Sequence, residues 1–406
     1  MAIMMPAIAM AQNWTEYSPK DKSKRQDVRN LLFLGQEQMP DTYRRLDHLF
    51  AIRTIKRGHI VFPLPMSASH ITIGYKLNGN TIEVEDFMKR NAVVGMLLIK
   101  DGKIIIERYA QGNSKTTRWP SWSVAKSITS TLVGAAVQDG YIGSIDDPVT
   151  KYLPQLKESA YEGSTVRELL QMSSGVKFNE KYSDRNSDFG RLMRCYYDKR
   201  PGCVLALAKT LPKETSAGSK FVYSTLDATL VGDIVMAATH KNLSDYLSEK
   251  IWSPLGMERN AWWVLESRNG QEFGGALMAA TLRDYGRFGQ FMLGGGTIGK
   301  NQVLPSYWIS EATHPYPGSV QVYYGNLDPG DPQGYGYYWW LFPPGKKTSP
   351  NQEEAYEALG IFGQHIYVNS QEKIVAVFWC VWPNAWVEDK DNEINDFIEA
   401  AVRALH

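Results

Sequence analysis

Cysteine, histidine and long apolar runs are scarce in this sequence, and each scarcity excludes a class of protein. The three cysteines, Cys195, Cys203 and Cys380, form no Cys-x-x-Cys pair, so we expect neither a disulfide framework nor a zinc site. The seven histidines are scattered without metal-ligand spacing, and we therefore predict no metal and no cofactor. No run reaches the roughly 18 apolar residues of a membrane-spanning helix.

An excess of charge of either sign is also lacking. The chain has 44 Lys and Arg against 43 Asp and Glu, which gives a formal net charge of +1. Nothing in this balance favours nucleic acid or an anionic membrane as a partner. The 406 residues suffice for one large or two moderate domains with a sizeable core. Composition leaves the oligomeric state open between a monomer and a homodimer.

The first residues of the chain allow two interpretations. Residues 1–10 are largely apolar, and Ala9-Met10-Ala11 before Gln12 resembles a signal-peptidase site. However, no basic residue precedes the apolar run, and the run is short. Residues 1–11 are therefore either a truncated signal segment of a periplasmic or secreted protein, which we favour, or an unstructured tail of a cytoplasmic one.

The stretch from Trp119 to Gly140 combines a predicted helix with reactive side chains. Apolar residues recur at helical spacing after Pro120, and Gly140 is suited to end the helix. Ser123 and Lys126 are three residues apart, so both side chains lie on one face of the first turn. A serine hydroxyl needs a base to become a nucleophile, and a lysine in an apolar pocket can be that base. The free N–H groups at a helix N-terminus would also stabilise negative charge there.

The spacing of this serine and lysine is weak evidence when it is taken alone. The pattern occurs at Ser123 and Lys126, at Ser174 and Lys177, and at Ser370 and Lys373. The second pair contains Gly175 and follows a predicted helix, so we interpret it as a turn. The third pair lies between two strand-like runs and is interpreted as a hairpin loop. Only the first pair opens a long, largely apolar helix.

Strand-like segments near both ends of the chain predict one antiparallel sheet. Residues 93–99 and 104–109 flank an Asp-Gly turn, and residues 362–368 and 374–381 form a second predicted hairpin. The segment between the hairpins is mostly helical in pattern, and an apolar stripe from Ile394 onward can cover a sheet face. We therefore predict an α+β fold, with an antiparallel sheet flanked by helices and an inserted, mostly helical domain.

The same patterns divide the chain into three predicted regions. Residues 1–74 look like an irregular N-terminal extension that wraps the main body. Residues 75–144 and 297–406 form the sheet domain, and residues 145–296 form the helical domain. The stretch 313–350 is rich in Pro, Gly and Tyr and is expected to be a long ordered loop. The helix after Ser123 starts where the two domains meet, a common place for a cleft.

Short motifs follow one another in a fixed order along the chain. They are Ser123 to Lys126 (Ser-Val-Ala-Lys), residues 167–175 (Arg-Glu-Leu-Leu-Gln-Met-Ser-Ser-Gly), Asn179 to Tyr182, Tyr223 to Thr225, residues 282–289, Tyr338 to Trp340, and Gly360 to Gln364. The set resembles the β-lactamase-like serine hydrolases of the class C type over residues 75–405. Within that family the resemblance is closest to 6-aminohexanoate-dimer hydrolases and related carboxylesterases. It implies a β-lactamase/transpeptidase-like fold and a serine hydrolase that cleaves an amide or ester bond.

The resemblance also implies a role for each matching residue. Ser123 would attack the substrate carbonyl and become an acyl-enzyme, Lys126 would relay its proton, and Tyr223 would act as base and then as acid. The backbone N–H groups of Ser123 and Ile361 would form the oxyanion hole. Tyr182 resembles a tyrosine that closes over the scissile amide. The candidates for the substrate pocket are Thr225, Trp339, Gly360 and Gln364.

Two departures from the family pattern bear on the substrate. The second motif usually reads Tyr-x-Asn but ends here in Thr225, and the usual Lys or His of the third motif is replaced where Ala358 and Leu359 precede Gly360. That cation helps to hold a substrate carboxylate, so its absence argues against penicillins and D-alanyl peptides and favours small esters or linear amides. A β-lactamase or D-amino-peptidase, and a catalytically silent acyl- or peptide-binding homologue, stay as alternatives.

Overall fold

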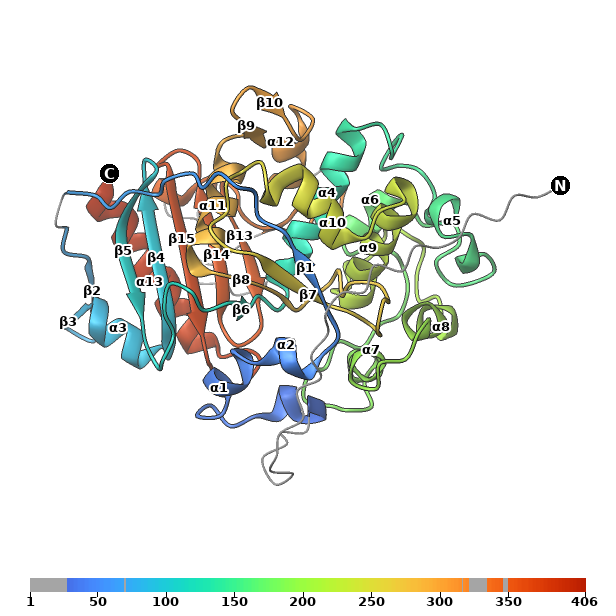
Figure 1. Ribbon diagram of the computed structural model, residues 1–406, viewed down its shortest axis with the longest axis horizontal. Coiled ribbons are helices and arrows are strands. Elements are labelled where there is room, and N and C mark those ends of the chain that lie inside the picture. The colour runs from blue at the N-terminus through green and yellow to red at the C-terminus, as the bar shows by residue number, and fades with distance from the viewer. Residues whose placement is uncertain (1–27, 69–70, 316, 321–333, 346–349) are drawn as a thin grey trace.

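A computed structural model of the protein describes residues 28–68, 71–315, 317–320, 334–345 and 350–406. In these ranges the chain forms a seven-stranded antiparallel sheet with helices on both faces and, beside it, a mostly helical part (Figure 1). The predicted α+β class is therefore confirmed. Over the same ranges, no helix has the length and apolar character needed to cross a membrane. The candidate signal segment 1–11 lies outside the described residues.

The central sheet joins the two predicted hairpins edge to edge. Its strand order is β11-β12-β13-β14-β15-β4-β5. The strands are β4 (Val93–Lys100), β5 (Lys103–Tyr109), β11 (Gly334–Tyr335), β12 (Trp340–Phe342), β13 (Ala355–Gly360), β14 (Gln364–Asn369) and β15 (Ile374–Cys380). Both hairpins are confirmed, and they become neighbours because β15 pairs with β4. We predicted a long loop over residues 313–350. The structure corrects this prediction, because the strands β11 and β12 lie in that stretch.

Both faces of the central sheet are buried, as the side chains of β15 show. Val375, Val377 and Trp379 point into one core cluster, and the alternate residues point into a second cluster, as the two-residue repeat of a strand requires. The second cluster is covered by α3 (Val84–Arg90) and α13 (Glu388–Leu405), where the rings of Phe87 and Phe397 stack at 4.2 Å. The predicted apolar stripe of the C-terminal helix thus covers a sheet face.

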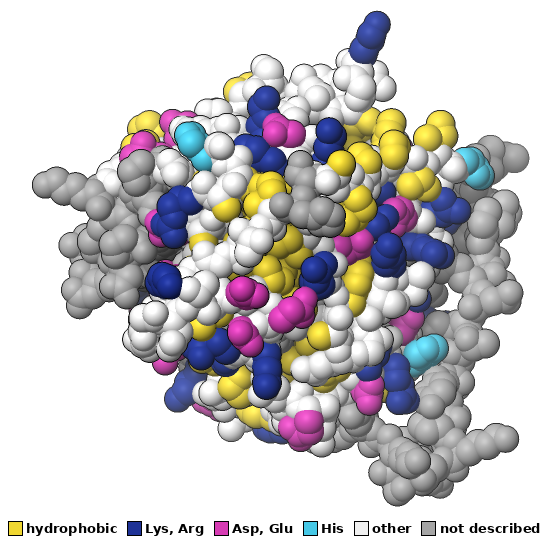
Figure 2. Space-filling view, turned by 90° about the vertical axis from the view of Figure 1, so that its left-hand side faces the viewer, with side chains coloured by type: hydrophobic (Ala, Val, Ile, Leu, Met, Phe, Trp, Pro, Cys, Tyr) yellow, Lys and Arg dark blue, Asp and Glu magenta, His cyan; other side chains and the backbone are white. Residues whose placement is uncertain are grey.

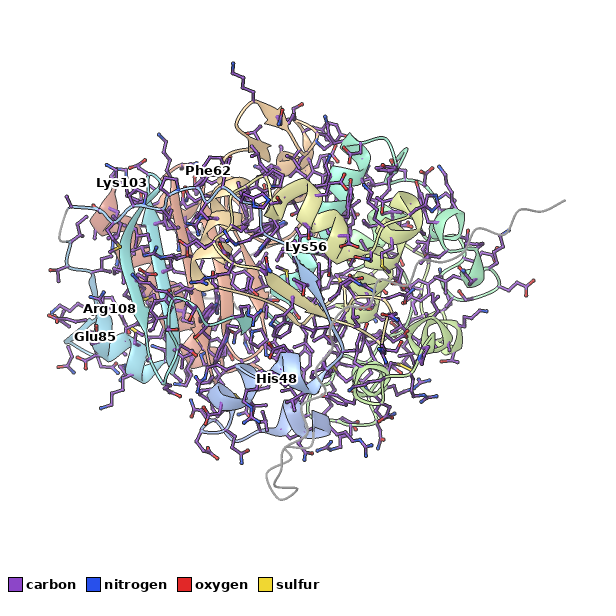
Figure 3. All side chains as sticks on the ribbon, viewed as in Figure 1. His48, Lys56, Phe62, Glu85, Lys103 and Arg108 are labelled. Carbon is purple, nitrogen blue, oxygen red and sulfur yellow. A yellow bond between two sulfur atoms is a disulfide. The ribbon has the colours of Figure 1, made fainter. Side chains whose placement is uncertain are left out.

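The edge strand β5 is tied to α3 by a surface ion pair. Arg108 Nε and Glu85 Oε1 lie 3.0 Å apart, and Figure 3 shows the two side chains next to each other. On this side of the molecule, Lys and Arg side chains are interspersed with Asp and Glu (Figure 2). The mixture agrees with the formal net charge of +1. Two short hairpins lie outside the central sheet: β2 (Gly74–Leu77) with β3 (Asn80–Glu83), and β9 (Thr297–Ile298) with β10 (Asn301–Gln302).

The opposite face of the central sheet is covered by α11 (Leu282–Leu293), which contacts β15, β14 and β4. Two helix glycines permit this approach, because a Cβ at Gly286 would lie 2.5 Å from Leu97 and a Cβ at Gly289 would lie 2.5 Å from Val375. We predicted that residues 145–296 form the helical domain, but α11 falls in that range and packs on the sheet. The local sequence of α11 does not show which part of the molecule the helix covers.

The N-terminal segment is more regular than the irregular extension we predicted. It contains η2 (Val28–Phe33), α1 (Met39–Tyr43), α2 (Leu46–Leu49) and β1 (Ile52–Ile55). β1 pairs with β7 (Ala261–Val264) in a second sheet, of order β1-β7-β8-β6, that also holds β8 (Met278–Ala280) and β6 (Trp119–Pro120). A partly buried ion pair, Arg53 Nη1 to Glu272 Oε1 at 2.7 Å, links β1 to the segment between β7 and β8. The local sequence lacked this information because β1 is stabilised by a partner about 200 residues away.

The helical part is organised around α9 (Thr225–Thr239). Packed near it are α4 (Val124–Gln138), α5 (Val149–Tyr152), α6 (Val166–Leu170), α7 (Asp188–Tyr197), α8 (Cys203–Thr210) and α10 (Leu243–Leu247). The remaining helical segments are η3 (Pro154–Leu156), η4 (Ser248–Trp252), α12 (Trp308–Ala312) and η5 (Pro350–Gln352). Thr165 and Glu168 form a capping box at the start of α6. Because α4 contacts both α9 and the strands β13 and β14, it joins the two parts of the molecule.

A single disulfide bond joins Cys195 and Cys203 in the described residues, where we expected no disulfide framework. The two residues lie near the end of α7 and at the start of α8, where a tight turn brings their Cα atoms to 5.5 Å. That separation suits a disulfide. The spacing of eight residues matches no familiar motif, so only the geometry of the helix pair reveals it. Cys380 is buried and free.

Candidate active site

Ser123 immediately precedes α4 and occupies its N-cap position. The residue before it, Trp122, has a φ of 47°, which is uncommon for a residue other than glycine. Packing holds this backbone in place, because the buried Trp122 ring lies 5.5 Å from that of Phe362 and 6.0 Å from that of Tyr43. Backbone strain of this kind is often found at functional sites. It turns the chain so that β6 leads directly into the helix that carries Ser123.

Lys126 is fully buried and makes three hydrogen bonds through its side-chain nitrogen. Its Nζ donates to Ser123 Oγ at 2.8 Å, to Thr225 Oγ1 at 2.9 Å and to the carbonyl of Gly275 at 2.9 Å. Burial lowers the pKa of Lys126, while the nearby charge of Glu180 opposes this effect. The ammonium is therefore easier to deprotonate than that of an exposed lysine. A serine held against such an amine has the partner that a nucleophile requires.

Glu180 lies on the other side of Thr225, and sequence reasoning did not identify it as a site residue. It is half-buried, and its Oε2 accepts a hydrogen bond from the backbone N–H of Thr225 at 2.9 Å. Its Oε1 accepts a hydrogen bond from the hydroxyl of the same residue. Burial raises the pKa of Glu180, and the charge of Lys126 partly offsets the rise. An acidic group thus faces the lysine across a single threonine hydroxyl.

Tyr223 lies against the lysine, as the predicted constellation requires. Lys126 Nζ is 4.9 Å from the centre of the Tyr223 ring, within the range of a cation–π contact. The ring is half-buried and stacks on Trp340 with 6.1 Å between the ring centres. Tyr335 meets the Trp340 ring edge-on at 4.9 Å. Three aromatic residues therefore form a wall beside the buried amine.

Tyr182 is the fourth predicted catalytic residue and lies next to Glu180. Burial raises the pKa of the Tyr182 phenol well above its usual value, with further contributions from Glu180 and Tyr223. Its ring packs edge-on against Phe189 at 4.9 Å and lines a cavity of about 160 Å³ that reaches toward η2. The phenol therefore stays protonated near neutral pH and can act only as a hydrogen-bond donor or acceptor there.

The end of β13 closes the site on the side of the Ser123 backbone. A Cβ on Gly360 would lie 2.5 Å from the carbonyl oxygen of Ser121 and 3.1 Å from the nitrogen of Ser123. Ile361 follows directly and is almost fully buried. Among the described residues, the N–H groups of Ser123 and Ile361 find no acceptor in the protein. Two such donors beside a nucleophile are the arrangement expected of an oxyanion hole.

Two of the predicted pocket residues belong to the core instead. Gln364 is buried, accepts a hydrogen bond from Trp119 Nε1 at 2.9 Å and donates to the carbonyls of Phe362 and Cys380. Its amide is therefore occupied in holding the turn after β13. Trp339 is fully buried against Phe288, whereas its neighbour Trp340 reaches the site. Motif order placed these residues near the serine but did not reveal the direction of their side chains.

Comparison with known proteins identifies the family. A family model described as Beta-lactamase matches residues 83–400. The chain belongs to the beta-lactamase family. The predicted resemblance is thereby confirmed, and the protein is an enzyme of the serine hydrolase class that shares the beta-lactamase fold. In the described part of this family member, no group of three His, Cys, Asp or Glu side chains is placed to hold a metal ion.

The proteins similar to this chain include a 6-aminohexanoate-dimer hydrolase and, by fold, a carboxylesterase. The 6-aminohexanoate-dimer hydrolase of Paenarthrobacter ureafaciens is 25% identical over 307 residues, which cover 74% of this chain and 76% of that protein. A Bacillus anthracis structure provisionally assigned as a 6-aminohexanoate-dimer hydrolase has a TM-score of 0.78 at 21% identity and covers 95% of this chain and 98% of its own. A family VIII carboxylesterase has a TM-score of 0.58 at 16% identity, with coverage of 79% and 96%. These two structures establish the shared fold.

Proposed function

We propose that this protein hydrolyses a small ester or linear amide through an acyl-enzyme, with Ser123 as the nucleophile. The observation that carries the proposal is the 2.8 Å hydrogen bond between Lys126 Nζ and Ser123 Oγ at the start of α4. A buried amine whose pKa is lowered by burial is suited to take the serine proton. Tyr223, with its ring against the amine, is our candidate for the second proton-transfer group.

Each proposed step uses a group whose position has been described. As Ser123 Oγ bonds to the substrate carbonyl carbon, its proton passes to the neutral amine of Lys126. The carbonyl oxygen becomes an oxyanion, which the N–H groups of Ser123 and Ile361 stabilise. Collapse of this intermediate breaks the ester or amide bond, and the departing alcohol or amine takes a proton from the pair formed by Lys126 and Tyr223. Water then attacks the acyl carbon and gives a proton to the pair of Lys126 and Tyr223. The bond between the acyl carbon and Ser123 Oγ breaks, the carboxylic acid leaves, and Ser123 Oγ regains a proton from the same pair.

The walls of the site support an uncharged, flexible acyl chain as the substrate part nearest the serine. Tyr223, Trp340 and Tyr335 offer apolar rings beside it, and such surfaces bind linear chains by burial of apolar area. The strand that ends at Gly360 has the buried apolar residues Ala358 and Leu359 where a cation would hold a carboxylate. The names of relatives, a 6-aminohexanoate-dimer hydrolase and a carboxylesterase, support the same choice of bond.

Export of the protein to an oxidising compartment is part of the proposal. The bond between Cys195 and Cys203 supports it, because structural disulfides persist mainly in exported proteins. Because Cys380 is buried, labelling free thiols in the unreduced, denatured protein would report one thiol, that of Cys380, if this disulfide is formed. Three reactive thiols under denaturing conditions would contradict it.

Replacement of the nucleophile tests the proposed reaction. Ser123→Ala should abolish p-nitrophenyl ester turnover and covalent labelling by a fluorophosphonate, while leaving the fold intact. Ser130→Ala is the matched control, because Ser130 lies seven residues further along α4 and is buried away from the reacting groups. The control should keep both activities. Ester turnover at the wild-type rate in a folded Ser123→Ala protein would end the proposal.

Two alternative functions give different results in the same assays. A β-lactamase or D-amino-peptidase would turn over a chromogenic cephalosporin or a D-alanyl peptide far faster than short esters or linear amides. A catalytically silent homologue would bind acyl or peptide ligands without a burst of product and without a labelled serine. A substrate panel that contains all four compound classes separates these outcomes.

A further inference from the structure

Four polar side chains form a continuous line of hydrogen bonds from the helical part to the nucleophile. In order they are Glu180, Thr225, Lys126 and Ser123. An ammonium has protons to give and no lone pair, so Lys126 must donate to the Thr225 oxygen. The Thr225 hydroxyl proton must then point elsewhere, and Glu180 Oε1 is there to accept it. The carboxylate therefore fixes the direction of each bond in the line.

The carboxylate of Glu180 is held in this position by a second bond. Its other oxygen accepts the N–H of Thr225 at 2.9 Å, and Thr225 is the first residue of α9. Free N–H groups at a helix start favour a negative charge there. Both carboxylate oxygens of Glu180 thus accept hydrogen bonds from Thr225, one from its backbone N–H and the other from its hydroxyl. Rotation of the Glu180 side chain would break both contacts.

We propose that Glu180 is a positioning residue of the active site, which through the Thr225 hydroxyl orients Lys126 and sets the pH at which this lysine becomes a free base. The inference rests on the proposed function, because it assumes that Lys126 activates Ser123. Glu180 itself touches neither the nucleophile nor the proposed oxyanion donors. It acts on the reaction only through Thr225 and Lys126.

The electrostatic effect of Glu180 on Lys126 has a definite sign. A carboxylate near an ammonium favours the charged form of both groups, and its charge opposes the lowering of the Lys126 pKa by burial. The other titratable group acting on Glu180 is the phenol of Tyr182, whose pKa burial raises well above its usual value, so that it is neutral at working pH. Asp188, on α7, is engaged with Arg191 at 2.9 Å. Glu180 is therefore the acid whose removal changes the charge felt by the lysine.

A purely structural role for Glu180, as a cap on α9, makes a different prediction. Loss of a cap lowers the stability of the protein. It would not move the pH at which the enzyme gains activity. The glutamine substitution separates the two roles, because a glutamine side chain can still accept the Thr225 N–H while it carries no charge. The pH profile, and not the melting temperature, is therefore the deciding measurement.

The test compares kcat/KM for a p-nitrophenyl ester from pH 4 to 9 in the wild type, Glu180→Gln and the control Glu214→Gln. Glu214 is an exposed glutamate paired with Lys220 at 3.0 Å, so the control makes the same charge change at a surface site. Without the carboxylate, Lys126 loses its proton at lower pH. The midpoint of the acidic limb should therefore fall by roughly one pH unit or more in Glu180→Gln and stay unchanged in Glu214→Gln. An unmoved midpoint in Glu180→Gln would overturn the inference.

A second pair of variants, both at Thr225, tests the hydrogen bond between the Thr225 hydroxyl and Lys126. This test does not depend on whether Glu180→Gln is stable. Thr225→Val removes the hydroxyl at nearly constant shape, and kcat should fall by about 10-fold or more, as for the loss of a hydrogen bond to a charged group. Thr225→Ser keeps the hydroxyl and should stay within a few-fold of the wild type. Equal activity of the valine and serine variants would also overturn the inference.

The Ser123→Ala variant separates failure of this inference from failure of the proposed function. If Ser123→Ala is inactive and the wild type is labelled by a fluorophosphonate, the reaction stands whatever the Glu180 variants do. In that case an unmoved acidic limb defeats only the role of Glu180. If Ser123→Ala keeps full activity, the proposed function fails first and the role of Glu180 fails with it.

Discussion

Gly360 marks the closest approach between the central sheet and the start of α4. A Cβ at this position would lie 2.5 Å from the Ser121 carbonyl oxygen and 3.1 Å from the Ser123 nitrogen. Both contacts are with backbone atoms, which cannot rotate away. Gly360→Ala must therefore push β13 from the Ser123 backbone and misalign the proposed oxyanion donors. We expect kcat to fall by about 100-fold or more, which is the typical effect of losing one such donor.

The control for this substitution is a glycine in open surroundings. A Cβ at Gly143 would meet its nearest neighbour, Asp147, at 3.7 Å, which is an ordinary contact distance. Gly143→Ala should leave kcat unchanged. Steady-state turnover of an ester and the extent of fluorophosphonate labelling measure both variants. A Gly360→Ala enzyme with wild-type kcat would show that the end of β13 does not shape the site.

At the scale of single residues, the sequence revealed contacts that are local and missed contacts that are distant. Ser123 and Lys126 could be paired because three residues on a helix define one face. Glu180 could not be paired with Thr225, since 45 residues separate them and only the packing of α9 brings them together. Gly275 contributes a backbone carbonyl to Lys126, and a backbone group leaves no signature in a sequence.

His365 on β14 is buried between carboxylates of two neighbouring elements, and it supplies a pH-dependent term in stability. Its Nδ1 lies 3.3 Å from Glu357 on β13, and its Nε2 lies 3.7 Å from Asp391 on α13. Burial lowers the pKa of His365 to about 4, despite the opposing charge of Asp391. In the unfolded chain its pKa returns to about 6.5. Between these values the unfolded state binds the extra proton, so the folded state loses stability as pH falls from about 6.5 to 4.

Replacing this histidine should flatten the pH dependence of stability. In the wild type, protonation of His365 on unfolding lowers the free energy of unfolding by on the order of 3 kcal/mol between pH 6.5 and 4, because each pH unit contributes about 1.36 kcal/mol. His365→Asn removes the titrating ring and should show a smaller loss of unfolding free energy between pH 6.5 and 4. Urea denaturation at a series of pH values measures both proteins. Parallel curves for the two proteins would mean that His365 does not bind a proton on unfolding.

At the scale of whole elements, the sequence predicted strands flanked by turns and missed strands that depend on their neighbours. The hairpin of β4 and β5 was visible because an Asp-Gly turn separates two apolar runs. β1 is four residues long, and β11 and β12 are shorter still, so their local patterns are too brief to separate from loops. β1 takes its strand geometry from pairing with the distant β7, whereas β11 and β12 pair with each other and β12 with β13. The position of α11 was also missed. Its glycines allow a close contact with another element, but the local sequence does not show that this element is the central sheet.

At the scale of the molecule, α4 binds the two parts of the chain into one core. Thr129 Oγ1 donates to the Gly274 carbonyl at 2.7 Å, and Ser127 Oγ donates to the Tyr338 carbonyl at 2.6 Å. A single buried cluster runs through α9, α4 and one face of the central sheet. Our division into a sheet domain, 75–144 and 297–406, and a helical domain, 145–296, stays a prediction about the path of the chain. Shared burial argues that neither part unfolds alone.

A cavity in α9 tests this cooperativity. Leu230 is fully buried in that helix, so Leu230→Ala should cost about 2–5 kcal/mol. If the parts unfold together, hydrogen exchange in urea should show the same shift in midpoint for peptides of α9 and of β15, although β15 lies in the central sheet. The exposed substitution Lys209→Ala on α8 should shift neither midpoint. A shift confined to α9 would instead reveal two separately unfolding domains, and the active site at their junction would then be lost with the first of them.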